Sequence, residues 1–130
     1  MKIGIDLKYI TNSKKGGNLG DKMVQRNVLR YVGELDCENE YYFYLNPNTD
    51  IEELGSFSQE NVRLKRMPWY HKNSILRNSF SIPLELFRDR VDVFHGSASL
   101  PLFYGGKKVM SMWEFSPLLY PEYFPANINI

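Results

Sequence analysis

Apolar residues are distributed along the chain in short runs separated by longer, periodic segments. The short runs lie at residues 2–7, 40–46, 61–68, 91–96 and 105–113. Runs of this length that are rich in β-branched and aromatic residues predict β-strands. The run VDVFHG is almost entirely apolar until its end, which is typical of a strand that is covered on both faces.

Two segments between these runs have helical periodicity. In DKMVQRNVLRYVGELD, at residues 21–36, apolar side chains recur at spacings of three and four, and basic residues gather on the opposite side. Residues 73–90, NSILRNSFSIPLELFRDR, have the same period, and Pro83 is expected to kink this helix or to start a second one. Strands and helices are therefore expected to alternate along the chain. This alternation predicts an α/β fold, a Rossmann-like parallel sheet with helices on both faces.

Length and composition indicate a single domain over residues 1–130. Of the 130 residues 43% are hydrophobic and 24% charged, which is ordinary for a globular protein with its own core. The formal net charge of +1 gives no general attraction to nucleic acid or to anionic membranes. No apolar stretch is long enough for a signal peptide or a membrane span, and Cys37 is the only cysteine. We therefore expect a cytoplasmic protein without disulfides.

Polar and glycine-rich segments follow the ends of three predicted strands. In open α/β sheets, ligands bind beyond the carboxyl ends of the strands, so these segments are expected to converge on one edge and to contact a substrate there. The candidate substrate-binding residues are Gly16, Gly17, Gly20, His95, Trp113 and Glu114.

The loop KKGGNLGDK has features that suit a phosphate or an oxygen-rich ligand. Glycine lets the backbone approach a ligand closely, and the helix that follows directs its free N–H groups toward the loop. The spacing G-G-x-x-G is neither the dinucleotide fingerprint nor a Walker loop. A surface loop that caps the helix explains the same residues, so both interpretations stay open.

The remaining polar residues at these strand ends have structural as well as functional interpretations. His95 can donate a hydrogen bond to a substrate hydroxyl, but a half-buried histidine with an internal partner is more common. Asp6 is expected to hold the N–H groups of the glycine loop. The stretch HGSAS is not the G-x-S-x-G elbow of serine hydrolases. Two histidines and one distant cysteine give no metal site.

Taken in order, several stretches resemble the N-terminal half of the group-1, family-4 retaining glycosyltransferases of the GT-B class. These are MKIGIDLKYI with the glycine loop, then QRNVLRYVGELDCENEYYFYLN, then VDVFHGSASLPLFYGGKKVMSMWEFSPLLYPEYFP. The most specific parts are DVFHG...LPL, KKV and SPLLYPEYFP, and the resemblance extends to about Pro125.

The resemblance implies two Rossmann-like domains that face each other across a cleft, with the acceptor on the first and the nucleotide sugar on the second. The chain would then be the acceptor-side domain, with the donor domain absent or supplied by a separate polypeptide. The complete enzyme would transfer a sugar from a nucleotide-sugar donor to a saccharide or lipid-linked acceptor without an obligatory metal or other cofactor. We therefore expect the isolated, truncated chain to be inactive.

Two positions depart from the pattern of this family. Relatives often carry a histidine–acid pair where this chain has Trp113 and Glu114, and an indole cannot act as a general base. The glycine spacing also differs from the common G-x-G form. These departures favour an alternative, a non-catalytic module that binds a sugar or a partner protein through exposed apolar side chains. A small nucleotide-binding regulator is a third interpretation that depends on the glycine loop alone. The candidate apolar contacts are Leu118, Leu119, Tyr120, Tyr123 and Phe124.

Overall fold

A computed structural model describes residues 1–10, 19–47, 49, 51, 59–67, 73–97, 99–112 and 115–123 of the chain. Over these residues the chain forms a sheet of five parallel strands in the order β3-β2-β1-β4-β5. The strands are β1 (Lys2–Asp6), β2 (Glu40–Leu45), β3 (Val62–Arg66), β4 (Val93–Ser97) and β5 (Lys107–Ser111). Four of them lie within the predicted runs, and β4 extends one residue beyond its run, to Ser97. The predicted parallel sheet is thereby confirmed.

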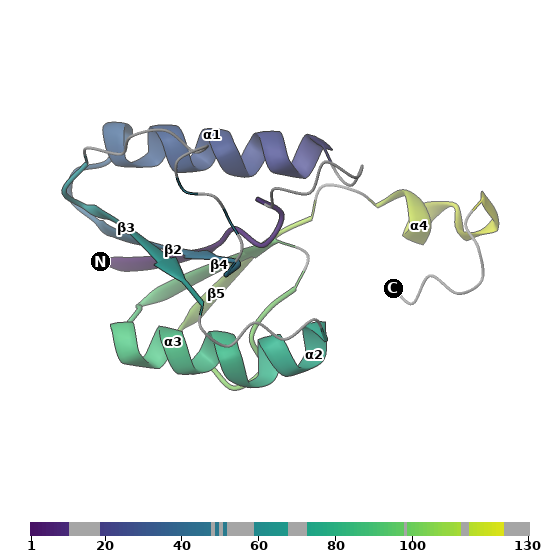
Figure 1. Cartoon of the computed structure of the whole chain (residues 1–130). Helices are drawn as coiled ribbons and strands as arrows, with labels where there is room; N and C mark the ends of the chain where they lie inside the picture. Colours follow the sequence, from purple (N-terminus) through teal and green to yellow (C-terminus); the bar gives the residue numbers. More distant parts are fainter. Residues whose placement is uncertain are drawn as a thin grey trace.

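Helices cover both faces of the sheet, as the sequence predicts (Figure 1). Helix α1 (Leu19–Leu35) lies on one face. The other face is covered by α2 (Ser74–Leu76), the π-helical segment η2 (Arg77–Ser81) and α3 (Ile82–Asp89), which follow one another without a break. The Rossmann-like α/β arrangement is thereby confirmed.

The sheet separates two apolar cores, and β2 contributes to both. Phe43 and Leu45 point toward α1 and pack with Leu29. Tyr44 points the opposite way and packs with Leu86 of α3. Because alternate residues of a strand face opposite sides, the part of a strand that is buried on both faces must be apolar or aromatic throughout, as YYFYL is after the exposed Glu40.

The helical stretch from α2 to α3 passes through Pro83 instead of ending there. The preceding segment widens into a π-turn, in which the N–H of Ile82 bonds to the carbonyl of Arg77. A proline has no N–H to continue this pattern to the carbonyl of Asn78. That carbonyl accepts the N–H of Leu102 at 3.1 Å instead, so the segment between β4 and β5 is tied to the helix.

The expected alternation of strands and helices is wrong between β4 and β5. Residues 99–106 form no helix there. Four of the five residues of β5 are exposed, so this edge strand is not covered as the others are. Helix α4 (Ser116–Leu119) and the 3-10 turn η3 (Pro121–Tyr123) extend away from the sheet and contain no buried residue (Figure 1). Over the described part of the chain, no helix has the length and apolar character that crossing a bilayer requires.

Candidate functional site

The strand order reverses between β1 and β4. From β1 the sheet continues through β2 to β3 on one side, and through β4 to β5 on the other. In sheets of this type the usual place for a ligand is the crevice beyond the carboxyl ends of the two central strands. Here these ends are Asp6 and Ser97, and the chain continues past them to Lys8 and Ser99.

Gln25 of α1 joins the ends of the two central strands. Its Nε2 donates to the carbonyl oxygen of Asp6 at 3.2 Å and to the hydroxyl of Ser97 at 3.1 Å. Its Oε1 accepts the backbone N–H of Tyr9 at 3.1 Å. The side chain is buried and uses both amide hydrogens and the amide oxygen. Gln25 therefore fixes the geometry of this edge from within.

A buried ion pair lies on the opposite side of the sheet from α1. Arg77 of η2 donates from Nη1 to Oδ2 of Asp6 at 2.7 Å and from Nη2 to Oδ1 at 2.5 Å. The two side chains are 4% and 0% exposed. Such a bidentate pair has specific geometry, and loss of one partner leaves a charge without compensation. Among the described residues the Asp6 carboxylate is thus paired with Arg77, a partner that the sequence analysis does not predict.

His95 of β4 is hydrogen-bonded to the neighbouring strand. Its Nε2 lies 2.7 Å from Oγ of Ser111 on β5. Half-burial lowers the pKa of the imidazole from its ordinary value of 6.5, because desolvation disfavours the charged form. The folded state therefore favours the neutral imidazole, and among the described residues Nδ1 has no hydrogen-bond partner. One ring nitrogen therefore has the kind of internal partner that is expected for a half-buried histidine.

Two partly buried groups lie where the chain leaves β1 and β4. Lys8 donates from Nζ to Oγ of Ser99 at 3.3 Å and lies 4.8 Å from the ring centre of Tyr9. Asn46, after β2, donates from Nδ2 to the carbonyl of Lys8 at 2.7 Å. The polar groups near this edge are therefore the ammonium group of Lys8, serine hydroxyls and the imidazole of His95. Beneath them lie the buried, hydrogen-bonded side chains of Gln25 and Arg77.

Gly96 allows the chain to turn back directly after β4. A Cβ at this position would lie 2.2 Å from the carbonyl oxygen of Ser99, which is much closer than atoms can approach. Any side chain there would push the 99–101 segment away from the end of the strand. The position of Ser99 beside Lys8 therefore depends on this glycine.

The structure describes two of the six predicted substrate-binding residues. His95 is the middle residue of β4, two residues before the carboxyl end of the strand, so the strand continues further than the sequence analysis expects. Gly20 is exposed in the first turn of α1, and a Cβ there would meet nothing within 4 Å, so packing does not require glycine. The other four predicted residues, which lie outside the described part of the chain, are Gly16, Gly17, Trp113 and Glu114.

The sequence pattern does not predict the two buried polar residues, Gln25 and Arg77, that hold the strand ends in place. Gln25 is a polar residue on the apolar face of α1, four positions before the buried Leu29, and this interruption was the available signal. Arg77 likewise lies on the buried face of its helix. A polar residue at a core position must be hydrogen-bonded, so both positions indicate a buried partner without identifying it.

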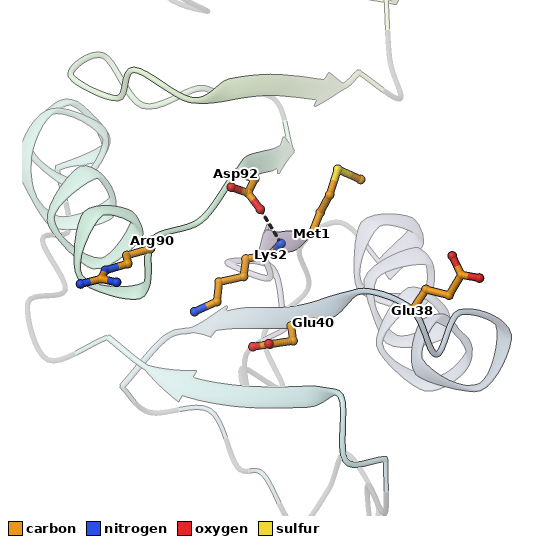
Figure 2. Close-up of a pocket in the computed structure, with 6 residues that line it drawn as sticks. All are labelled: Met1, Lys2, Glu38, Glu40, Arg90 and Asp92. Carbon is orange, nitrogen blue, oxygen red and sulfur yellow. Dashed lines mark hydrogen bonds between the residues drawn. The ribbon is translucent and has the colours of Figure 1, made fainter.

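A shallow polar depression lies at the opposite, amino edge of the sheet (Figure 2). It mixes cations with carboxylates, and several of them already have partners. The N–H of Lys2 donates to Asp92 at 2.8 Å, and the hydroxyl of Tyr42 donates to Glu40 at 3.2 Å. No single ligand charge suits this lining. The lining residues are Met1, Lys2, Glu38, Glu40, Arg90 and Asp92.

No protein-family model matches the chain, and searches of the curated proteins and of the solved structures find no similar protein. The resemblance to glycosyltransferases therefore stays a prediction from the segments quoted above. The structure shows the parallel sheet, its strand order and the polar residues at its carboxyl edge, and these do not depend on the resemblance.

Proposed function

We propose that the chain is the acceptor side of a nucleotide-sugar glycosyltransferase and that the carboxyl edge of its sheet binds a saccharide. The observation that carries the proposal is the position of His95, with Nδ1 unpartnered among the described residues. This residue lies on the central strand β4, two residues before the carboxyl end of that strand at the switch point of an all-parallel sheet. The sequence segments quoted above support the proposal further, because they resemble this family.

The chemistry of the edge suits a polyhydroxylated ligand. Sugar hydroxyls donate and accept hydrogen bonds, and a neutral imidazole does both. The hydroxyls of Ser99 and Ser111 offer the same adaptability, while Lys8 adds a donor with a positive charge. The buried Gln25 and Arg77 hold these groups on rigid strand ends, which lowers the cost of ordering a site when a ligand binds.

Catalysis in this proposal needs a donor domain on another polypeptide or another part of the protein. Stabilisation of the leaving diphosphate is the main electrostatic task of the reaction, and the described edge offers one lysine for it. The purified chain should therefore release no sugar from nucleotide-sugar donors. Turnover above a protein-free blank would contradict this part of the proposal.

Ligand-detected NMR with a panel of mono- and disaccharides tests the acceptor site directly. We expect saturation transfer to at least one saccharide, and loss of that signal in His95→Ala and Lys8→Ala. The matched control is His71→Ala, because it removes the other of the two histidines. Absence of transfer to every saccharide, or equal signals in all three variants, would contradict a saccharide site at this edge.

A non-catalytic binding module is the second candidate function, and the segment after β5 favours it. Leu119 and Tyr123 are more than half exposed, and no residue of α4 or η3 is buried. Phe124, proposed for the same surface, lies outside the described residues. The neighbouring reading frame discriminates between the two functions. A donor-binding domain encoded there, with turnover when both polypeptides are mixed, would favour the split enzyme over the module.

A further inference from the structure

Lys8 lies at the point where the two central strands of the sheet end. It follows β1 by two residues, and its Nζ donates to Oγ of Ser99 at 3.3 Å. Ser99 follows β4 and is 91 positions away in the chain, so this hydrogen bond bridges the switch point between β1 and β4. A ligand at the place that is usual for this kind of sheet would therefore contact both side chains.

The ammonium group of Lys8 is held by neutral partners. It lies 4.8 Å from the ring centre of Tyr9, and its hydrogen bond to Ser99 is made to a hydroxyl. Both contacts restrict the position of the side chain, but neither compensates its charge. The ion pairs that the structure shows among the described residues do not include Lys8, although the residue is partly buried.

The carboxylate that is closest to Lys8 in the chain does not compensate this charge either. Both oxygens of Asp6 are bound by Arg77, and that pair is neutral as a whole. Asp21, in the first turn of α1, forms no ion pair with Lys8 among the described residues. A charge that is partly removed from water is normally paired. The uncompensated ammonium group therefore favours a ligand that brings an anion of its own.

We propose that the saccharide at the carboxyl edge is an acidic sugar, and that Lys8 and Ser99 hold its carboxylate or phosphate monoester. This inference rests on the proposed saccharide site and names its substrate class. Ser99 accepts a hydrogen bond from Lys8, which leaves the hydrogen of its own hydroxyl to donate to the same anion. The ammonium group has further hydrogens for a charge-assisted hydrogen bond. One anionic group can thus be bound by both side chains.

The number of donors favours an acidic sugar over the diphosphate of a nucleotide sugar. A diphosphate carries several charges, and sites that stabilise it supply several cationic or backbone donors. The described residues offer one ammonium group and one hydroxyl at the switch point, which match a single carboxylate or phosphate. The close turn at Gly96 keeps Ser99 beside Lys8, so these two donors are in place before a ligand binds.

Titration of the full chain with matched sugars, followed by ligand-detected NMR, tests the proposal. The probes are glucose, glucuronate and glucose 6-phosphate, and the same three forms of galactose, because the members of each series differ only at C6. We expect an acidic member of at least one series to bind about tenfold more tightly than its neutral parent. This advantage should shrink as salt is raised, whereas the affinity for the neutral parent should not change.

Two variants of Lys8 separate its charge from its hydrogen bonds. Lys8→Gln should remove the advantage of the acidic sugar and keep the affinity for the neutral parent, because the amide still donates. Lys8→Arg should retain most of the advantage, since the positive charge remains. The matched control is Lys107→Gln, at an exposed position at the amino end of β5, which should leave every affinity unchanged. Circular dichroism verifies that each variant keeps its fold.

The outcomes distinguish this inference from the saccharide site on which it rests. Equal affinities for acidic and neutral sugars would overturn the inference and leave the site standing, whereas absence of binding to every sugar would overturn both. Inorganic phosphate that binds as tightly as the sugar phosphates would also overturn it, because the sugar would then not be recognised. Uridine diphosphate is the last probe. Binding of uridine diphosphate that depends on Lys8, without a preference for acidic sugars, would assign the lysine to a donor instead.

Discussion

The guanidinium of Arg77 holds both carboxylate oxygens of Asp6, a residue 71 positions earlier in the chain. This contact joins η2 to the end of β1, directly below the edge where the two central strands diverge. Both side chains are excluded from solvent, so neither charge can be compensated by water if the other is lost. The pair thus couples the packing of one helical layer to the shape of the candidate site.

Replacement of Arg77 by methionine should destabilise the fold by about 3–5 kcal/mol, because it leaves the Asp6 carboxylate buried without a partner. Urea denaturation measures the change. The double variant Asp6→Asn/Arg77→Met should be less destabilised than Arg77→Met, since no uncompensated charge remains. Arg63→Met, at an exposed position on β3, is the matched control and should change stability by less than about 0.5 kcal/mol. Equal effects of the two arginine substitutions would contradict this account of the pair.

Two glycines should respond to alanine in opposite directions. Gly96→Ala places a Cβ against the carbonyl oxygen of Ser99 and should cost about 1–3 kcal/mol. Gly20→Ala meets open space in the first turn of α1 and should stabilise the chain by about 0.5–1 kcal/mol, because alanine is the better helix former. Thermal denaturation of both variants measures the difference. If both variants changed stability in the same direction, the close approach of Ser99 to Gly96 would not explain the effect of Gly96→Ala.

The strands and helices could be predicted because each pattern is local to its element. EYYFYL has the composition of a strand buried on both faces, and NVLRYV has the period of a helix with one covered face. The polar framework could not be predicted in this way. Gln25 meets Ser97 across 72 positions, and its partner follows from the strand order, which the spacing of residues does not contain. The tie between Leu102 and Asn78 likewise depends on where Pro83 leaves a carbonyl free.

The ionised carboxylate of Asp36, which directly follows α1, should stabilise the folded chain, and this stabilisation should be lost in acid. Hydrogen bonds from the hydroxyl of Tyr41 at 2.6 Å, the side chain of Asn39 at 2.6 Å and the N–H of Glu38 at 2.9 Å lower its pKa from 3.8 to about 2. Because the folded state favours the ionised form, the contribution is complete above pH 3.8 and is lost as the pH falls toward about 2.

The Asp36→Asn variant checks this expectation. It should have a flatter dependence of stability on pH in that acid range than the natural chain, as measured by urea denaturation at a series of pH values. Glu60→Gln, at an exposed position, is the control and should leave the dependence unchanged. Parallel curves for the natural chain and Asp36→Asn would show that these hydrogen bonds do not shift the carboxyl group.

His95 should titrate below the ordinary imidazole pKa of 6.5, because its half-buried ring is desolvated in the folded state. The folded chain therefore binds fewer protons than the unfolded chain near this pH, and the contribution of His95 to stability falls as the pH drops below 6.5. Two-dimensional NMR of the imidazole signals measures the midpoint, and His71→Asn assigns the remaining signal to His95. Ser111→Ala should leave the midpoint below 6.5, because burial and not the hydroxyl is the cause.

A midpoint at or above 6.5 in the natural chain would mean that the ring is not desolvated. A larger fraction of the imidazole would then be charged near neutral pH. A charged ring can only donate to a sugar hydroxyl, so the neutral hydrogen-bonding role proposed for His95 would fail with it.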